Sequence, residues 1–249
     1  MRMTWTLTND DRRRVRELMD MMHDNALVRC RRERNLSPSE APSHAQVWWE
    51  IVACQLSTQQ RSGPDSPIAR LLQKDPFPLA LDAVEAAEDR DAMVQHVLVS
   101  AGGVHRYRVL GRYLADNLNT LEQGAWEDFD KQFQSLCPAA TLQDERRSAA
   151  VVRDALLGIG PKQSRNLLQG LGLSRFVLPI DSRIVKWLNG GFAPWEITAK
   201  PLGDEAYYAL VEDMVQVLSQ AADVTPCELD AAVFARVDGD GWNEAKLVW

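Results

Sequence analysis

Apolar residues recur three and four positions apart along most of this chain, and no segment shows the alternation typical of a β-strand. The first such series, Val15 to Ala26, follows Thr8-Asn9-Asp10-Asp11, whose side chains can cap a helix. Further helices are predicted over 47–56, 66–73, 78–88, 94–99, 106–118, 129–136, 149–157, 181–189 and 207–221, with a last one from about residue 226. The hydrophobic pattern therefore predicts an all-α protein.

Two polar stretches interrupt this pattern. Residues 34–45 are rich in Ser and Pro, and we predict a loop that crosses between two parts of the protein. Residues 55–64 are also polar, although they directly follow the apolar helix predicted at 47–56. A loop that only connects two helices does not require so many amide and hydroxyl side chains, so we regard residues 55–64 as a candidate functional segment.

A short helix-hairpin-helix is predicted around Gly158-Ile159-Gly160. The apolar stretch 149–157 ends abruptly there, and Pro161 suits the first turn of a new helix because its missing N–H would have had no partner. The apolar face of this second helix comprises Leu167, Leu168 and Leu171. N–H groups at a helix N-terminus attract anions, so in a helical protein the hairpin predicts a site for a backbone phosphate.

Composition is that of a soluble globular protein of 249 residues, long enough for one large or two small lobes. The net charge of −7 argues mildly against nucleic-acid binding. The charge is uneven, however. Residues 151–190 carry six Lys or Arg and two Asp, a local charge of +4, and 102–113 contain Arg106, Arg108 and Arg112 with no acid, whereas 82–91 hold five acids and one Arg. A local basic face can bind phosphate whatever the global sum, although solvated helix faces explain each patch equally well.

Metal, disulfide and membrane sites are not indicated by the sequence. The four cysteines, Cys30, Cys54, Cys137 and Cys227, lie far apart with no CxxC pair, so we expect reduced, mostly buried thiols. The histidines show no metal-binding spacing, and no metal is expected. The N-terminal residues lack an apolar signal core, and no stretch approaches the length needed to span a membrane.

Lys162 and Asp181 are the two candidate catalytic residues. Lys162 lies in the first turn of the second hairpin helix, where the helix dipole disfavours a cation, and Arg165 adds like charge one turn later. Both effects favour the neutral, nucleophilic amine. A structural interpretation stays open for each residue: Lys162 as an exposed lysine that contacts phosphate, and Asp181 as the N-cap of the next helix.

Together these residues resemble a known arrangement. Leu156-Leu157-Gly158-Ile159-Gly160-Pro161-Lys162 is followed, 19 residues after the lysine, by the aspartate of Leu178-Pro179-Ile180-Asp181. The two segments resemble the Leu-Pro-Gly-Val-Gly-x-Lys and Val-Pro-Val-Asp patterns of the helix-hairpin-helix, Gly/Pro-rich, Asp DNA glycosylase superfamily. The interval is similar to that of its 8-oxoguanine branch. Leu157 stands where the family usually has Pro, and the cysteine-bound iron–sulfur loop of the endonuclease III branch is absent.

Two weaker likenesses lie upstream. Leu56-Ser57-Thr58-Gln59-Gln60 is similar to the family's Leu-Ser-x-Gln segment, which inserts a polar side chain into the gap left by an extruded base. The segment from Gly102 to Arg108 resembles the family's Gly-rich helix start. The likeness therefore covers roughly residues 47–189.

The resemblance implies a base-excision DNA glycosylase with AP lyase activity that acts on double-stranded DNA and prefers 8-oxoguanine. Asp181 would stabilise the cationic sugar as the glycosidic bond breaks, and Lys162 would attack C1′ and form a Schiff base. The implied DNA contacts are Gln59, Gln60, Gly158, Gly160, Gln163 and Ser164, with Gln59 or Gln60 filling the space of the extruded base. No cofactor is required on this view, and a monovalent cation is expected at the carbonyls of Leu156 and Ile159.

The resemblance also implies two helical lobes with the hairpin at the cleft between them. Residues 47–172 would form a central domain, and residues 1–46 with 173–249 a second domain. We expect a monomer without membrane contact, located in the cytoplasm with a bacterial nucleoid or in a eukaryotic nucleus. Candidates for stacking on a base are Trp187, Trp195, Phe234 and the aromatic segment 242–249, although core packing explains most of these residues.

Three alternatives remain open at this point. The chain could be a glycosylase of the same superfamily for oxidised pyrimidines or another base. It could be a non-enzymatic helix-hairpin-helix protein that only holds the DNA backbone. It could also be a helical interaction protein in which Gly158-Ile159-Gly160 is a tight turn.

Overall fold

The computed structural model describes residues 5–36, 40–58, 65–137 and 139–238. These residues form thirteen α-helices and contain no strand, which confirms the predicted all-α fold. The elements are α1 (Asn9–Met22), α2 (Ala26–Asn35), α3 (His44–Leu56), α4 (Pro67–Leu72), α5 (Leu81–Glu85), α6 (Arg90–Ala101), α7 (Tyr107–Thr120), the π-helical turn η1 (Leu121–Ala125), α8 (Trp126–Leu136), α9 (Leu142–Ala155), α10 (Pro161–Gly170), α11 (Ser182–Asn189), the 3-10 turn η2 (Pro201–Gly203), α12 (Glu205–Ala221) and α13 (Pro226–Asp238).

Side-chain caps place two helix starts differently from the sequence prediction. The single helix expected through Ala26 is interrupted, because the Asn25 side chain accepts the N–H of Leu27 at 2.9 Å and begins α2. Helix α9 starts at Leu142, seven residues before the predicted start, because Thr141 and Asp144 form a reciprocal capping box. Both predicted boundaries were wrong because polar capping residues, and not the spacing of apolar residues, determine where these two helices begin.

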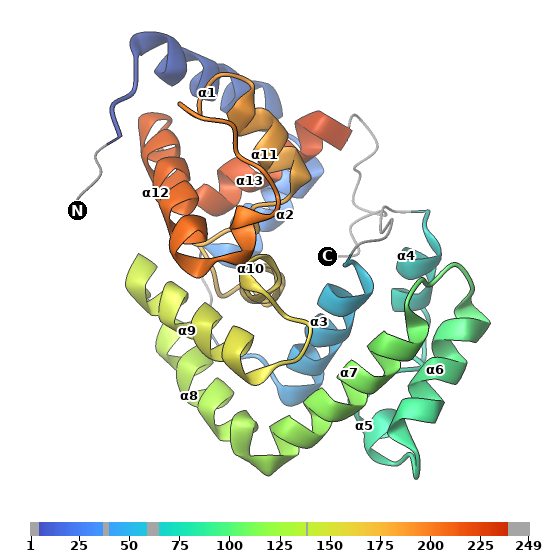
Figure 1. The fold of residues 1–249 in the computed structure, drawn as a ribbon. Helices are drawn as coiled ribbons and strands as arrows, with labels where there is room; N and C mark the ends of the chain where they lie inside the picture. The colour runs from blue at the N-terminus through green and yellow to red at the C-terminus, as the bar shows by residue number, and fades with distance from the viewer. Residues whose placement is uncertain (1–4, 37–39, 59–64, 138, 239–249) are drawn as a thin grey trace.

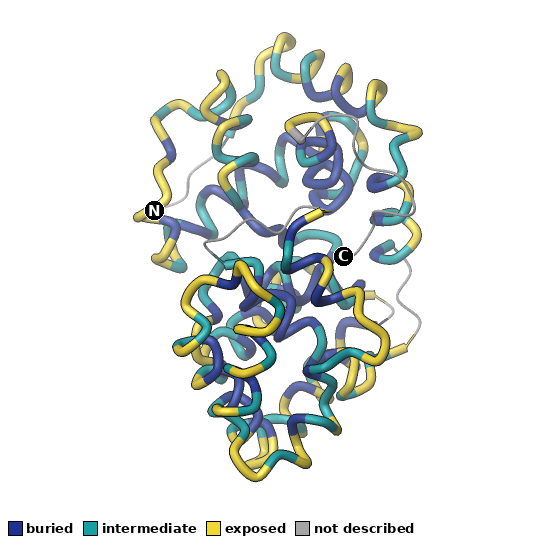
Figure 2. Tube along the Cα trace, turned by 90° about the vertical axis from the view of Figure 1, so that its right-hand side faces the viewer, coloured by how far each residue is buried: buried dark blue, intermediate teal, exposed yellow. Residues whose placement is uncertain are grey.

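The helices enclose two hydrophobic clusters. The first cluster draws its buried residues from 47–177, and the second from 15–28 and 178–235. Helices α1, α2, α11, α12 and α13 lie together in the upper part of Figure 1, with α3 to α9 below and α10 between the two groups. Figure 2 shows buried residues running through the interior of both groups. The chain passes from one cluster to the other between Val177 and Leu178, and the domain boundaries predicted from the sequence stay a prediction.

A buried carboxylate holds the segment in which the chain changes cluster. Glu145 of α9 accepts the N–H groups of Arg175, Phe176 and Val177, each at 2.8 Å. Burial raises the pKa of Glu145 to about 7, although the three N–H donors lower it. From the other side, the Asn35 amide donates to the carbonyl of Ser174 at 2.9 Å. The main chain from Ser174 to Val177, which leads into the second cluster, is therefore held by side chains of α9 and α2.

Candidate active site

The predicted hairpin lies between α9 and α10. Gly158 has φ +77°, and a Cβ at this position would lie 2.6 Å from Cδ2 of Tyr113 on α7. Glycine is therefore required both for the left-handed backbone and for the close approach of the tyrosine ring. Leu157, at the position where the resembling family has Pro, is 48% exposed, so its side chain adds little to the packing of the turn.

Side chains of α3 and α7 fix the hairpin backbone from within. The Gln55 amide donates to the carbonyl of Leu157 at 2.9 Å, and Asn117 of α7 bonds the same residue. Both amides are buried. Asn117 was not predicted to hold the hairpin, because it lies 40 residues before its partner and belongs to no motif.

The predicted DNA contacts differ in their accessibility. Gly158 is exposed and Gly160 is half-buried. The side chains of Gln163 and Ser164 are instead used inside the protein: the Gln163 amide donates to the carbonyl of Cys54 and the hydroxyl of Thr58, and the Ser164 hydroxyl donates to the carbonyl of Pro161. Their predicted DNA contacts stay a prediction, for which the N–H groups of the first helical turn are available because they lack intrahelical partners.

The predicted wedge residues Gln59 and Gln60 lie outside the described residues. The structure does describe the end of α3 that leads to them. The hydroxyls of Ser57 and Thr58 both donate to the carbonyl of Cys54, at 3.0 and 2.9 Å. Gln163 of α10 bonds Thr58 as well, so the hairpin helix is attached to the chain directly before the predicted wedge.

Lys162 is half-buried in the first turn of α10, and its charge acts on Cys54 of α3. Burial raises the pKa of the Cys54 thiol to about 12, and the charge of Lys162 opposes this shift. Arg165 does not supply the like-charge repulsion expected from the sequence. Its fully buried guanidinium pairs with Glu205 and Glu212 of α12, so its charge is compensated inside the protein.

Internal ion pairs account for most of the basic run predicted over 151–190. Arg153 and Arg165 pair with Glu205, Arg175 lies 4.0 Å from Glu145, and Arg183 lies 2.7 Å from Asp181. The local charge of +4 therefore overestimates the positive surface. Glu145 and Glu205 lie outside the residues counted, so their charges are absent from that sum, whereas Asp181 is already part of it.

Asp181 caps α11. Its Oδ1 accepts the N–H groups of Arg183 at 2.8 Å and Ile184 at 3.1 Å, and its side chain is 17% exposed. The structural interpretation of this residue is therefore correct, and it leaves a catalytic role possible because the carboxylate still reaches solvent. Fully buried Asp230 of α13 lies close by: burial raises the pKa of Asp230 to about 6, Arg31 opposes the shift, and the charge of Asp181 adds to it.

The described aromatic candidates for base stacking lie in the second cluster. Trp187 packs against Phe192 with ring centroids 4.4 Å apart, and the indole N–H of Trp195 donates to the hydroxyl of Tyr207 at 2.9 Å. The guanidinium of Arg183 lies 4.0 Å from the Phe234 ring centroid and also pairs with Asp181. Residues 242–249 lie outside the described part of the chain.

The hairpin carbonyls differ in how they are used. The carbonyl of Leu157 accepts hydrogen bonds from two side-chain amides. The monovalent cation predicted at the carbonyls of Leu156 and Ile159 stays a prediction. Neutral carbonyl oxygens are ligands for hard cations. In the described residues, no group of three or more His, Cys, Asp or Glu could hold a metal ion.

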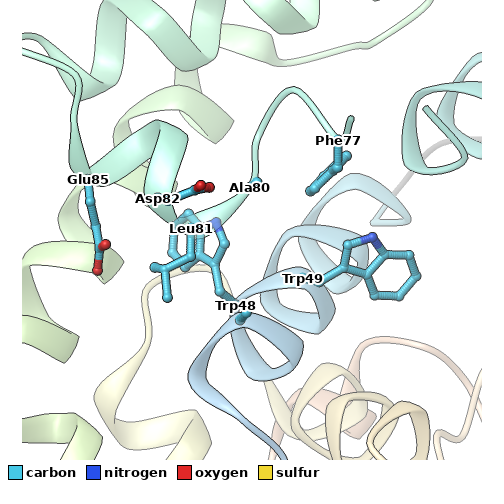
Figure 3. A pocket seen from close by; sticks show the side chains of 8 residues that line it. Trp48, Trp49, Phe77, Ala80, Leu81, Asp82 and Glu85 are labelled. Atoms are coloured by element: carbon cyan, nitrogen blue, oxygen red, sulfur yellow. The ribbon is translucent and has the colours of Figure 1, made fainter. Parts of the chain in front are cut away.

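An apolar pocket of about 390 Å³ lies elsewhere, between α3 and α5 (Figure 3). Trp48, Trp49, Phe77 and Leu81 form much of its wall, and Asp82 and Glu85 lie at it. None of the predicted site residues lines this pocket. Separately, no helix within the described ranges is long and apolar enough to cross a membrane.

Comparison with known proteins identifies the fold. The sequence matches no protein-family model and none of the curated proteins. Among solved structures, the 8-oxoguanine DNA glycosylase of Methanocaldococcus jannaschii is similar with a TM-score of 0.68 and 16% identity, covering 92% of this chain and 94% of that chain. The 8-oxoguanine DNA glycosylase of Thermotoga maritima gives a TM-score of 0.68 at 14% identity, covering 93% and 98%.

A third structure is the M. jannaschii 8-oxoguanine glycosylase/lyase in complex with a 15mer DNA that contains 8-oxoguanine. Its TM-score is 0.66 at 14% identity, covering 93% of this chain and 99% of that chain. At this coverage the similarity includes residues of both hydrophobic clusters. This chain therefore has the all-α fold of archaeal and bacterial 8-oxoguanine DNA glycosylases.

Proposed function

We propose that this protein is a base-excision DNA glycosylase that removes an oxidised base, preferably 8-oxoguanine, and then cleaves the abasic site as a lyase. The observation that carries the proposal is the placement of Lys162 and Asp181 on this fold. Lys162 lies in the first turn of the helix after the hairpin, and Asp181 caps the helix that follows the segment bonded by Glu145. The structure of similar fold that is in complex with DNA containing 8-oxoguanine supports DNA as the substrate.

In the first step, the hairpin N–H groups hold a backbone phosphate while the damaged base leaves the stack. The Asp181 carboxylate stabilises positive charge on the sugar as the glycosidic bond breaks. The Lys162 amine supplies the electron pair that forms the new bond to C1′, and the base departs with the bonding electrons and a proton. The C1′–O4′ bond of the sugar then breaks as the Lys162 nitrogen forms the C1′=N Schiff base, and O4′ takes up a proton and stays on C4′ as a hydroxyl. Loss of a proton from C2′ of the Schiff base then breaks the C3′–O bond, and this β-elimination releases the 3′ strand with its phosphate.

A panel of duplex oligonucleotides tests the proposal, each carrying 8-oxoguanine, thymine glycol, uracil or an alkylated base. We expect strand cleavage at 8-oxoguanine and covalent trapping of the protein by borohydride. If only duplexes with an oxidised pyrimidine were cleaved, the preferred substrate would be an oxidised pyrimidine and not 8-oxoguanine. Gel retardation without cleavage of any duplex would favour a non-enzymatic DNA-binding protein instead.

A further inference from the structure

One buried hydroxyl bonds the main chain directly before Asp181. The N–H of Ile180 donates to the hydroxyl of Tyr208 at 2.6 Å, and this hydroxyl donates to the carbonyl of Leu178 at 2.9 Å. Between them lies Pro179, which has no N–H to donate. Because the segment belongs to no regular structure, Tyr208 satisfies two main-chain groups that would otherwise be buried without partners.

The ring of Tyr208 is in turn held by the helix that carries Lys162. The guanidinium carbon of Arg165 lies 4.9 Å from the Tyr208 ring centroid, and both side chains are fully buried. Arg165 follows Lys162 by about one turn of α10, and its ion pairs with Glu205 and Glu212 hold it against α12. Burial raises the pKa of Tyr208 well above its ordinary value, so the hydroxyl keeps its proton for the bond to Leu178.

These contacts form a continuous path between the two candidate catalytic residues. From Lys162 it runs along α10 to Arg165, across the ring to the Tyr208 hydroxyl, and through the Ile180 N–H to Asp181. We propose that Tyr208, supported by Arg165, is a positioning residue that sets the Asp181 carboxylate relative to the Lys162 amine. This inference rests on the proposed function, because it assigns Tyr208 a part in base removal.

The two proposed steps should respond differently to loss of this hydroxyl. Base removal depends on where the Asp181 carboxylate lies, and a misplacement of about 1 Å can cost on the order of 100-fold in rate. Cleavage of a preformed abasic site needs the Lys162 amine but no breakage of a base–sugar bond. A merely structural role for Tyr208 would instead slow both reactions alike, in proportion to the folded fraction.

The test compares Tyr208→Phe with Tyr207→Phe under single-turnover conditions, on an 8-oxoguanine duplex and on a preformed abasic site. Tyr207 is a matched control because its hydroxyl bonds the Trp195 indole and not the segment before Asp181. We expect Tyr208→Phe to slow base removal about tenfold and to keep abasic-site cleavage within about twofold. Tyr207→Phe should change neither rate.

Arg165→Lys provides a second variant, which keeps a positive charge beside Glu205 and Glu212 but removes the planar group from the Tyr208 ring. It should show the same difference between the two reactions, with base removal slowed about threefold. Equal losses in both reactions, or no loss in either, for folded Tyr208→Phe would overturn the positioning role. Wild-type protein that cleaves neither substrate would overturn the proposed function itself.

Discussion

The side-chain amide of Asn117 bonds both main-chain groups of Leu157. Its Oδ1 accepts the Leu157 N–H at 2.7 Å, and its Nδ2 donates to the Leu157 carbonyl at 3.1 Å. The hairpin thus obtains from one fully buried side chain the pair of hydrogen bonds that a neighbouring strand would supply. The position of the turn is consequently set by α7 and not by the turn sequence alone.

Asn117→Ala should destabilise the protein because it leaves the Leu157 N–H without its partner, while Gln55 still serves the carbonyl. We expect the free energy of unfolding to fall by about 2 kcal/mol, as measured by denaturant titration. Exposed Asn119 on the same helix is the control, and its replacement by Ala should change stability by less than about 0.5 kcal/mol. Equal effects of the two substitutions would contradict the role given to Asn117.

Lys162→Gln should abolish covalent trapping by borohydride on an 8-oxoguanine duplex, because the amide cannot form a Schiff base. DNA affinity should stay within about threefold, since the hairpin N–H groups are unchanged. Lys186→Gln, at an exposed position on α11, should trap as wild type does. Undiminished trapping of the Lys162→Gln protein would assign the nucleophile to another amine.

Asp181→Asn separates the two roles of this carboxylate. An asparagine oxygen can still accept the N–H groups of Arg183 and Ile184, so the melting temperature should change little. Base removal should fall by at least about 100-fold, because the negative charge that stabilises the sugar cation is lost. Asp181→Ala, which also removes the cap, should cost about 1 kcal/mol of stability. Normal activity per folded Asp181→Asn molecule would leave the residue with a capping role alone.

Glu50 of α3 makes stability depend on pH. The carboxylate lies against Gly170 of α10, where any Cβ would overlap it, and burial raises its pKa to about 7 while Arg34 and Arg31 lower it. The folded protein therefore holds the proton more tightly than the unfolded chain. Its contribution to stability is complete below about pH 4.5 and is lost as the pH rises through about 7.

Between these pH values, wild type should lose up to about 3 kcal/mol of unfolding free energy relative to Glu50→Gln, at about 1.4 kcal/mol per pH unit. Urea titrations of both proteins across the range measure this difference. Glu145 and Asp230 titrate in both proteins and cancel in the comparison. Glu88→Gln, at an exposed position, should run parallel to wild type. A pH-independent difference between wild type and Glu50→Gln would show that Glu50 does not titrate in this range.

The all-α fold and the helix-hairpin-helix could be predicted from the sequence because both follow from local properties. Apolar spacing defines most helices, and Gly158 with Pro161 defines the turn between α9 and α10. The early start of α9 was also readable in principle, since Thr141 and Asp144 have the spacing of a capping box. In that case apolar spacing was given too much weight.

The contacts that arrange the candidate site could not be read in the same way. Three side chains bond main-chain groups that lie about 30 or 40 residues away, namely those of Asn117, Glu145 and Tyr208. The residue type at a position does not show whether its main-chain groups need such a partner. A polar residue in a helix pattern is ordinarily assigned to the surface. Only the packing of α7, α9 and α12 shows that these three side chains are buried and which groups they reach.

The arginines paired within the protein affect how strongly counterion release can contribute to DNA binding. For duplex DNA, the logarithm of affinity falls with the logarithm of salt concentration by about 0.9 for each phosphate that a cation neutralises. Arg153, Arg165 and Arg175 face carboxylates of this chain, so none of them adds fully to that slope. On the proposed function, the affinity for DNA should therefore fall less steeply with salt than the six Lys and Arg of 151–190 would suggest. Undamaged DNA binds mainly through its phosphates. The fraction of this protein that is bound to undamaged DNA should therefore be smaller than for a strongly basic protein.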